Sequence, residues 1–197
     1  MGKASIIGAS NRTDSEREKD DFYATHMDAA RMLADIEELS SRIWEPACGK
    51  GHISEPLKQL GFDVMSTDLV NRGYGEGGID FLGTDELFEG DIVTNPPYKL
   101  AVPFIRKALS TVAYGHKVCM FLKVQFLEGE GHRKLFDQYP PSRVWVSSRR
   151  IPCAKDGDFS KANSMIAYAW FVWFKGIKGP TELRWFNSAK DRKESFK

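Results

Sequence analysis

Short apolar runs separated by polar, glycine-containing turns recur along the chain, and stretches of helical periodicity lie between them. The β-branched run at 90–94 predicts a buried strand, and apolar residues at i, i+3 and i+4 spacing predict a helix over 101–112. On the same grounds we expect strands at 41–45, 63–68, 79–82, 117–122, 143–147 and 164–174, and helices at 26–39, 52–60 and 128–139. This alternation of strands and helices indicates an α/β domain.

The loop Asn95-Pro96-Pro97-Tyr98 joins the strand at 90–94 to the next helix. It lies at the carboxyl end of a strand, where open α/β sheets bind their ligands. Each proline fixes φ and removes an N–H, so the loop is stiff and rich in acceptors, and the Asn95 side chain adds another acceptor. Converging acceptors suit a substrate –NH2 group, and Tyr98 offers a flat face for a planar ring. The alternative is a rigid turn in which Asn95 caps the following helix.

A strand, a glycine-rich turn and a helix surround Gly49 and Gly51, and this order opens nucleotide-binding βαβ units. Glycines let the backbone approach a ligand, and a helix N-terminus favours a negative group. Asp68 ends the next strand, a position from which an acidic side chain binds ribose hydroxyls. The alternative for Asp68 is a helix N-cap. The three-glycine dinucleotide fingerprint is not met, because Ser54 stands at its third position, and no Walker phosphate loop is present.

Two further groups of residues could border a ligand. Asp80 would present a carboxylate, and Phe81 an apolar face, to an adenine ring, with ordinary strand-end polarity as the alternative. Phe22 and Tyr23 could plug the end of the core or wall a pocket. We expect Thr25 to be the N-cap of the helix that follows.

Composition restricts the protein class. The 197 residues are 42% hydrophobic and 28% charged, which is ordinary for a globular domain. No apolar run approaches the roughly 18 residues of a membrane span, and no signal peptide opens the chain. The three cysteines and four histidines are scattered, so we expect a cytoplasmic protein without a disulfide framework or a metal site. The net charge of +1 means that any basic surface must be local.

We expect residues 1–20 to form a mobile polar arm and residues 21–197 to form a single domain. A basic loop follows the strand at 143–147. Its cations could contact phosphates, or they could belong to an ordinary solvated loop. They are Arg149, Arg150, Lys155 and Lys161.

Four features follow one another in an informative order: the aromatic segment at 21–25, the glycine turn at 45–51, Asp68 and the loop at 95–98. This order resembles the S-adenosylmethionine-dependent N6-adenine DNA methyltransferases in their compact bacterial and bacteriophage form. The resemblance covers roughly residues 21–185. It implies a Rossmann-like class I methyltransferase fold, with a seven-stranded, mostly parallel sheet, helices on both faces and an antiparallel C-terminal hairpin.

The implied reaction is transfer of a methyl group from S-adenosylmethionine to the exocyclic N6 amine of adenine in DNA. The attack is direct and in line, on a flipped-out base, and needs no cysteine nucleophile. The resemblance gives the catalytic loop to Asn95, Pro96, Pro97 and Tyr98, with Asn95 and the Pro96 carbonyl accepting from the amine and Tyr98 stacking on the base. It implies a cofactor site made of Phe22, Thr25, Glu45, Ala47, Gly49, Gly51, Asp68, Asp80 and Phe81.

In contrast to larger members of the family, we expect no separate target-recognition domain. The loops at 125–133 and 149–161 are the remaining candidates for reading DNA. Three other functions stay open: an RNA adenine methyltransferase, a protein glutamine methyltransferase, and a catalytically idle nucleic-acid-binding module of the same fold. The target sequence and the oligomeric state cannot be read from these residues.

Overall fold

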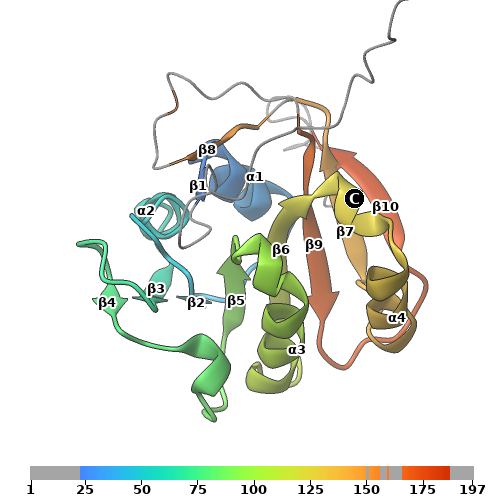
Figure 1. Ribbon diagram of the computed structural model, residues 1–197, viewed down its shortest axis with the longest axis horizontal. Helices are drawn as coiled ribbons and strands as arrows, with labels where there is room; N and C mark the ends of the chain where they lie inside the picture. Colours follow the sequence, from blue (N-terminus) through green and yellow to red (C-terminus); the bar gives the residue numbers. More distant parts are fainter. Residues whose placement is uncertain (1–22, 150, 156–158, 160–165, 187–197) are drawn as a thin grey trace, which may run out of the picture.

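The computed structural model describes residues 23–149, 151–155, 159 and 166–186 (Figure 1). The expected arm at 1–20 lies outside these residues. So do three residues with expected roles in binding, which are Phe22, Arg150 and Lys161.

An eight-stranded sheet forms the centre of the molecule, in the order β10-β7-β9-β6-β5-β2-β3-β4 (Figure 1). Strand β9 runs antiparallel to β6 and β7, and every other neighbouring pair is parallel. This confirms the Rossmann-like fold with a hairpin of β7 and β9. The strands are β2 (Arg42–Glu45), β3 (Asp63–Asp68), β4 (Glu76–Gly77), β5 (Asp91–Thr94), β6 (Lys117–Lys123), β7 (Arg143–Ser147), β9 (Tyr168–Phe174) and β10 (Glu182–Phe186).

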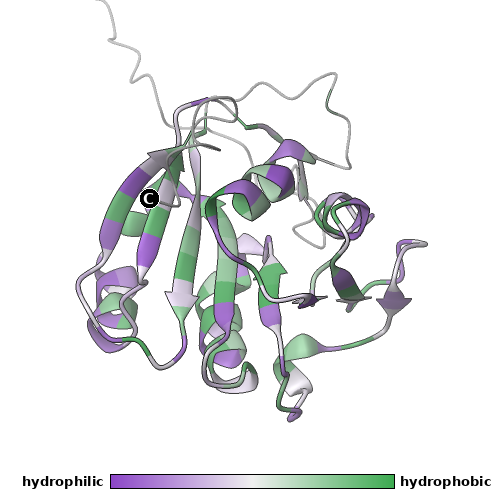
Figure 2. Cartoon of the chain, turned by 180° about the vertical axis from the view of Figure 1, so that it is seen from behind, coloured by the Kyte–Doolittle hydropathy of each residue, from purple (hydrophilic) through white to green (hydrophobic). Residues whose placement is uncertain are grey.

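Two layers of helices cover the sheet (Figure 1). Helices α1 (Asp28–Ile36) and α2 (Ser54–Gln59) contribute to one hydrophobic core, and α3 (Ala101–Thr111) and α4 (Glu130–Gln138) contribute to the other. Strand β6 serves both cores, because Cys119 and Phe121 face one layer while Val118 and Met120 face the other. A strand buried on both faces reads as a continuous apolar run, and the hydrophobic colour follows β6 for much of its length in Figure 2. No helix in the described part of the chain combines the length and the apolarity that crossing a membrane requires.

The expected count of seven strands was one too low, because β10 adds a strand by pairing in parallel with β7. Residues 182–185 alternate polar and apolar, but four of the five residues of β10 are exposed, including Leu183 and Trp185, so this alternation does not mark a buried face.

The expected strand at 79–82 was wrong. Asp80 instead accepts a hydrogen bond from Leu82 N (3.0 Å) and caps the short 3₁₀ helix η2 (Phe81–Gly83). A side-chain acceptor that captures a backbone N–H two residues later turns the chain and prevents an extended conformation. The short strand of this region, β4, lies a few residues earlier.

Thr25 is not the N-cap of α1, because Met27 holds that position and makes no side-chain capping bond. Thr25 ends the short strand β1 (Tyr23–Thr25), which pairs antiparallel with β8 (Cys153–Lys155). These two strands form a separate sheet, here called the β1–β8 ribbon. The ribbon places residues 23–25 beside a segment about 130 positions later in the sequence.

Candidate active site

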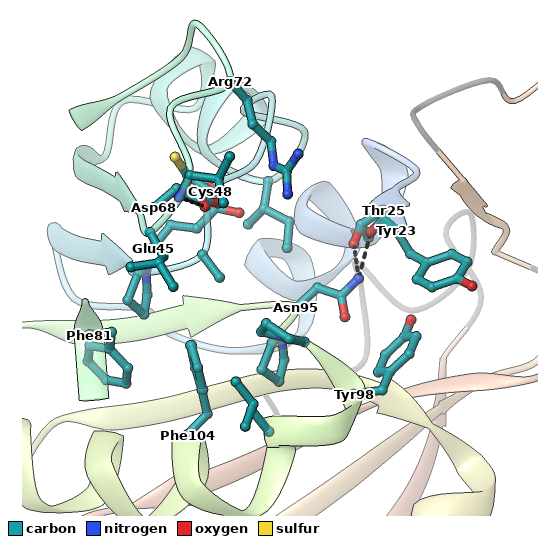
Figure 3. Close-up of a pocket in the computed structure, with 18 of the residues that line it drawn as sticks. Tyr23, Thr25, Glu45, Cys48, Asp68, Arg72, Phe81, Asn95, Tyr98 and Phe104 are labelled. Atoms are coloured by element: carbon teal, nitrogen blue, oxygen red, sulfur yellow. Dashed lines mark hydrogen bonds between the residues drawn. The ribbon is translucent and has the colours of Figure 1, made fainter. Parts of the chain in front are cut away.

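A cavity of about 400 Å³ opens at the carboxyl ends of β2, β3 and β5 (Figure 3). The glycine turn after β2, the loop after β3, η2, the β1–β8 ribbon and the Asn95 loop all contribute to its wall. Ten of the residues expected in the site line it, and they are Thr25, Glu45, Ala47, Asp68, Asp80, Phe81, Asn95, Pro96, Pro97 and Tyr98. The structure therefore brings together residues spread over 70 positions of the sequence.

The side chain of Asn95 is held in one orientation. Its Nδ2 donates to the carbonyl oxygen of Tyr23 (3.1 Å) and to Oγ1 of Thr25 (2.9 Å), drawn as dashed lines in Figure 3. These two bonds use both N–H groups of the amide. Its Oδ1 is buried and accepts no hydrogen bond from the residues that the structure describes. A buried acceptor left open costs stability, so its presence at the cavity indicates a function.

The two prolines after Asn95 shape the loop and its wall. The Pro97 carbonyl accepts from Leu100 N (2.8 Å), within the short turn that leads into α3. Pro96 is buried and lines the cavity. The Asn95 side chain does not cap the next helix, because the residues at the N-caps of η3 (Tyr98–Leu100) and α3 are Pro97 and Leu100.

The ring of Tyr98 lies among other side chains at the rim of the cavity. It stacks on Tyr23, with ring centroids 5.8 Å apart, and the ammonium of Lys123 lies 4.5 Å from its centroid. Burial raises the pKa of the hydroxyl well above its ordinary value, and nearby Cys153 and Tyr168 add to the shift. Tyr98 therefore remains a neutral phenol with an aromatic face near the Asn95 loop.

Glu45 ends β2 and is almost fully buried, at 2% exposure. Burial raises the pKa of its carboxyl to about 8, although hydrogen bonds from Ser54 act in the opposite direction. Ser54 Oγ donates to Glu45 and lies 2.6 Å from Ser66 Oγ. A carboxyl with this pKa is largely protonated at neutral pH, so Glu45 joins the glycine turn to α2 and β3 as a neutral hydrogen-bonding group.

Asp68 ends β3 and fixes the glycine turn. Its Oδ2 accepts from Gly49 N and its Oδ1 from Val70 N, each at 2.8 Å. Gly49 has φ +55°, and a glycine adopts this conformation without the strain of a side chain. Each carboxylate oxygen keeps a second lone pair, so Asp68 can still accept from hydroxyl groups in the cavity.

Gly51 has φ +82°, and the place of its missing side chain is filled by a ring. An added Cβ would lie 2.5 Å from Cζ of Tyr74. Gly49 and Gly51 do not line the cavity; they shape the turn that does. On the opposite wall, Asp80 is exposed, whereas Phe81 is buried at 2% exposure and packs against Trp44 and Phe104.

The cysteines near the cavity are poor nucleophiles. All three cysteines of the chain are free thiols, and Cys48 lines the cavity. Burial raises the pKa of Cys48 to about 12 and that of Cys153 to about 11. Thiols with such pKa values carry almost no thiolate at neutral pH. Among the described residues, no group of three or more His, Cys, Asp or Glu side chains could hold a metal ion.

The structure describes the basic loop in part. Arg149 is exposed after β7, and the backbone of Lys155 pairs with Tyr23 in the β1–β8 ribbon. The ribbon thus links this loop to the strand that contacts Asn95.

The sequence interpretation missed several contributors to the site. His52, Arg72 and Phe104 line the cavity, and the contacts that the Tyr23 carbonyl and the Thr25 hydroxyl make with Asn95 were not foreseen. Phe104 could be found only as an apolar helix position, and Arg72 only as a cation in a glycine-rich loop. Burial lowers the pKa of His52, which favours its neutral form.

No protein-family model matches the chain, and no curated protein matches it by sequence. Solved structures do match. A protein from Listeria monocytogenes, assigned as a class I S-adenosylmethionine-dependent methyltransferase, has a TM-score of 0.56 at 12% identity, over 81% of this chain and 62% of its own. This chain thus spans less than two thirds of that protein.

Two further structures are similar. A modification subunit assigned to a type I restriction enzyme of Vibrio vulnificus has a TM-score of 0.55 at 12% identity, over 90% of this chain and 50% of its own. A predicted O-methyltransferase from Agrobacterium tumefaciens has a TM-score of 0.55 at 13% identity, over 79% of this chain and 85% of its own. The chain therefore has the Rossmann-like fold found in class I methyltransferases.

Proposed function

We propose that this chain transfers a methyl group from S-adenosylmethionine to the N6 amine of adenine in DNA. The observation that carries the proposal is the Asn95 amide. Both of its N–H groups are used by β1, while its buried Oδ1 keeps an open acceptor at the end of β5. An acceptor held in this way selects a donor on the substrate, and an exocyclic –NH2 group is such a donor.

The cavity fits the cofactor. Its volume of about 400 Å³ lies within the range of small-molecule sites, and a mostly apolar wall with a few polar groups is typical of them. Asp68 would accept from the ribose hydroxyls, Phe81 would face the adenine, and the turn that contains Ala47 would hold the amino acid portion. When bound, S-adenosylmethionine supplies an electrophilic methyl group on a sulfonium.

The residues of the loop then act on the target amine. An amine conjugated to a purine is a weak nucleophile, because its lone pair is delocalised into the ring. Asn95 Oδ1 and the Pro96 carbonyl would each accept one of its hydrogens, which favours a more pyramidal nitrogen and directs the lone pair towards the methyl group. The transfer is direct, and the protonated thiols of Cys48 and Cys153 agree with a route that uses no enzyme nucleophile.

The target base must leave the helix to reach the loop. Stacking on Tyr98 would offset part of the unstacking cost, at about 1–3 kcal/mol for a base–aromatic contact. The Tyr23 ring covers part of Tyr98 in this structure, so one of the two side chains must rotate for the base to stack. Arg149, Arg150, Lys155 and Lys161 are the proposed phosphate contacts, and the similar Vibrio subunit belongs to a restriction enzyme, a class that acts on DNA.

A single assay separates this function from its rivals. Tritiated S-adenosylmethionine is offered with duplex DNA, RNA and protein in parallel, and the products are digested and analysed by mass spectrometry. We expect N6-methyladenine in the DNA. Methylated adenine in RNA alone, methylglutamine in the protein, or no transfer to any substrate would each contradict the proposal and would point to one of the three alternative functions.

A further inference from the structure

We infer that the β1–β8 ribbon orients the Asn95 amide, and that Thr25 is its positioning residue. This inference rests on the proposed function, since it states how the acceptor for the target amine is set. The resemblance instead places Thr25 in the cofactor site.

The amide has two orientations, which differ by exchange of Oδ1 and Nδ2. The Tyr23 carbonyl can only accept, so it attracts Nδ2 (3.1 Å) and would repel Oδ1 at the same place. The Thr25 hydroxyl lies 2.9 Å from Nδ2 and takes the second N–H. Together the two acceptors leave Nδ2 with no hydrogen for the substrate, and Oδ1 becomes the group available to it.

The ribbon fixes these two acceptors by its own pairing. Tyr23 pairs with Lys155 and Thr25 with Cys153, and His26 N donates to the Pro152 carbonyl (3.2 Å) just beyond. Thr25 is 2% exposed, so its side chain is fixed by packing in the wall of the cavity. Neither ribbon strand belongs to the eight-stranded sheet that carries Asn95. The large sheet therefore supplies the Asn95 amide, whereas the β1–β8 ribbon sets its orientation.

The test compares Thr25→Val with Thr25→Ser. Valine keeps the shape of threonine but cannot accept a hydrogen bond, whereas serine keeps the hydroxyl. We expect Thr25→Val to lower kcat about tenfold, because one buried N–H then keeps only the distant Cys153 Sγ, 4.0 Å from Nδ2, and the amide is held by one strong bond. Cofactor Kd and substrate KM should stay within about twofold, and Thr25→Ser should retain most of the activity, on the same hydrogen-bond reasoning.

A second readout needs no activity. The two Nδ2 protons of Asn95 can be followed by NMR with ¹⁵N-labelled full-length protein, with Asn95→Asp used to assign them. We expect slow solvent exchange for both protons in the wild type and in Thr25→Ser, and faster exchange of one proton in Thr25→Val. If no substrate is methylated, the proposed function fails, and the NMR result still decides whether Thr25 orients the amide.

Two results would overturn the inference. In one, Thr25→Val weakens cofactor binding while kcat is kept, which would return Thr25 to the role that the resemblance implies. In the other, Thr25→Val leaves both kcat and the exchange of the Asn95 protons unchanged.

Discussion

The two ends of the sheet treat their buried polar groups in opposite ways. At the amino ends of the strands, Glu37 accepts from Nε and Nη2 of Arg143 (2.6 and 2.7 Å) and from Trp145 Nε1 (2.7 Å). Asp91 at the same end accepts from the backbone N–H groups of Ser40 and Lys117. These charges are paired and hydrogen-bonded, as buried charges must be to persist.

At the carboxyl ends, acceptors remain open. Thr94 Oγ1 and Asn95 Oδ1 are buried and have no hydrogen-bond partner among the described residues, and the carboxyl of Glu45 is held neutral by burial. Buried polar groups without hydrogen-bond partners lower the stability of the fold, and proteins accept this loss mainly at sites that bind a ligand. From this difference we infer that polar groups at the amino ends of the strands stabilise the fold, while those at the carboxyl ends are arranged for a ligand. Changes at the two ends should therefore affect different measurements.

The largest effect should come from Asn95→Ala. Loss of a preorganised group of this kind typically lowers kcat by about 10²–10³, so methyl transfer should fall close to background. Cofactor binding should persist, because the Asp68 side of the cavity is unchanged. Transfer assays and calorimetry on the same preparation test both statements. Full methyl transfer by the variant would refute the role of Asn95. It would also contradict the assignment of ligand binding to the carboxyl ends of the strands.

Arg143→Met should act on stability instead. It leaves the Glu37 carboxylate buried without its cation, which costs roughly 3 kcal/mol, the low end for a broken buried pair because Arg143 is partly exposed. Urea unfolding measures this loss, and the kcat of the folded variant should be unchanged. Arg133→Ala is the matched control, because it removes an exposed pair with Asp137 and should leave the unfolding midpoint in place. A drop in kcat without a loss of stability would contradict the division of roles.

A third effect concerns the pH dependence set by Glu45. Its pKa is about 8 in the folded chain and near the ordinary 4.5 in the unfolded chain, so between these values the folded state holds a proton that the unfolded state has released. Glu45 therefore favours folding at low pH, and its contribution falls as pH rises from about 4.5 to about 8.

Glu45→Gln should flatten this slope and should be more stable than the wild type at pH 8, since a neutral amide carries no charge to bury. Urea unfolding of the cofactor-free protein over the pH range measures it. An unchanged slope would show that Glu45 is not protonated as its burial indicates.

Local patterns predicted the central strands and most helices, because an apolar run such as Val118–Leu122 reports its own burial. They also located Asn95 and Asp68, since both follow strands whose carboxyl ends meet at one edge of the sheet. Local patterns failed where the role of a residue depends on a partner far away in the sequence. Thr25 looked like a helix cap from its neighbours and like a cofactor contact from the resemblance, whereas its partners in the structure are Asn95 and a strand about 130 residues away.

Strand β10 and Asp80 were misjudged for other reasons. The apolar residues Leu183 and Trp185 of the strand are exposed, so their alternation does not indicate a buried face. Asp80 turns the chain through one side-chain hydrogen bond that propensities do not include. The acceptor role of Asn95 was inferred from its residue type, but the orientation of its amide depends on the Tyr23 carbonyl and the Thr25 hydroxyl, two partners that no local pattern identifies.

The β1–β8 ribbon has a consequence for synthesis on the ribosome. A nascent chain that has emerged through β5 already contains β1, the glycine turn and Asn95, yet β8 is still about 60 residues from being made. Contacts between such distant segments form late. Translation must therefore pass Lys155 before β1 can pair, so a product terminated before β8 would contain the glycine turn and the Asn95 loop but not the ribbon that contacts the amide.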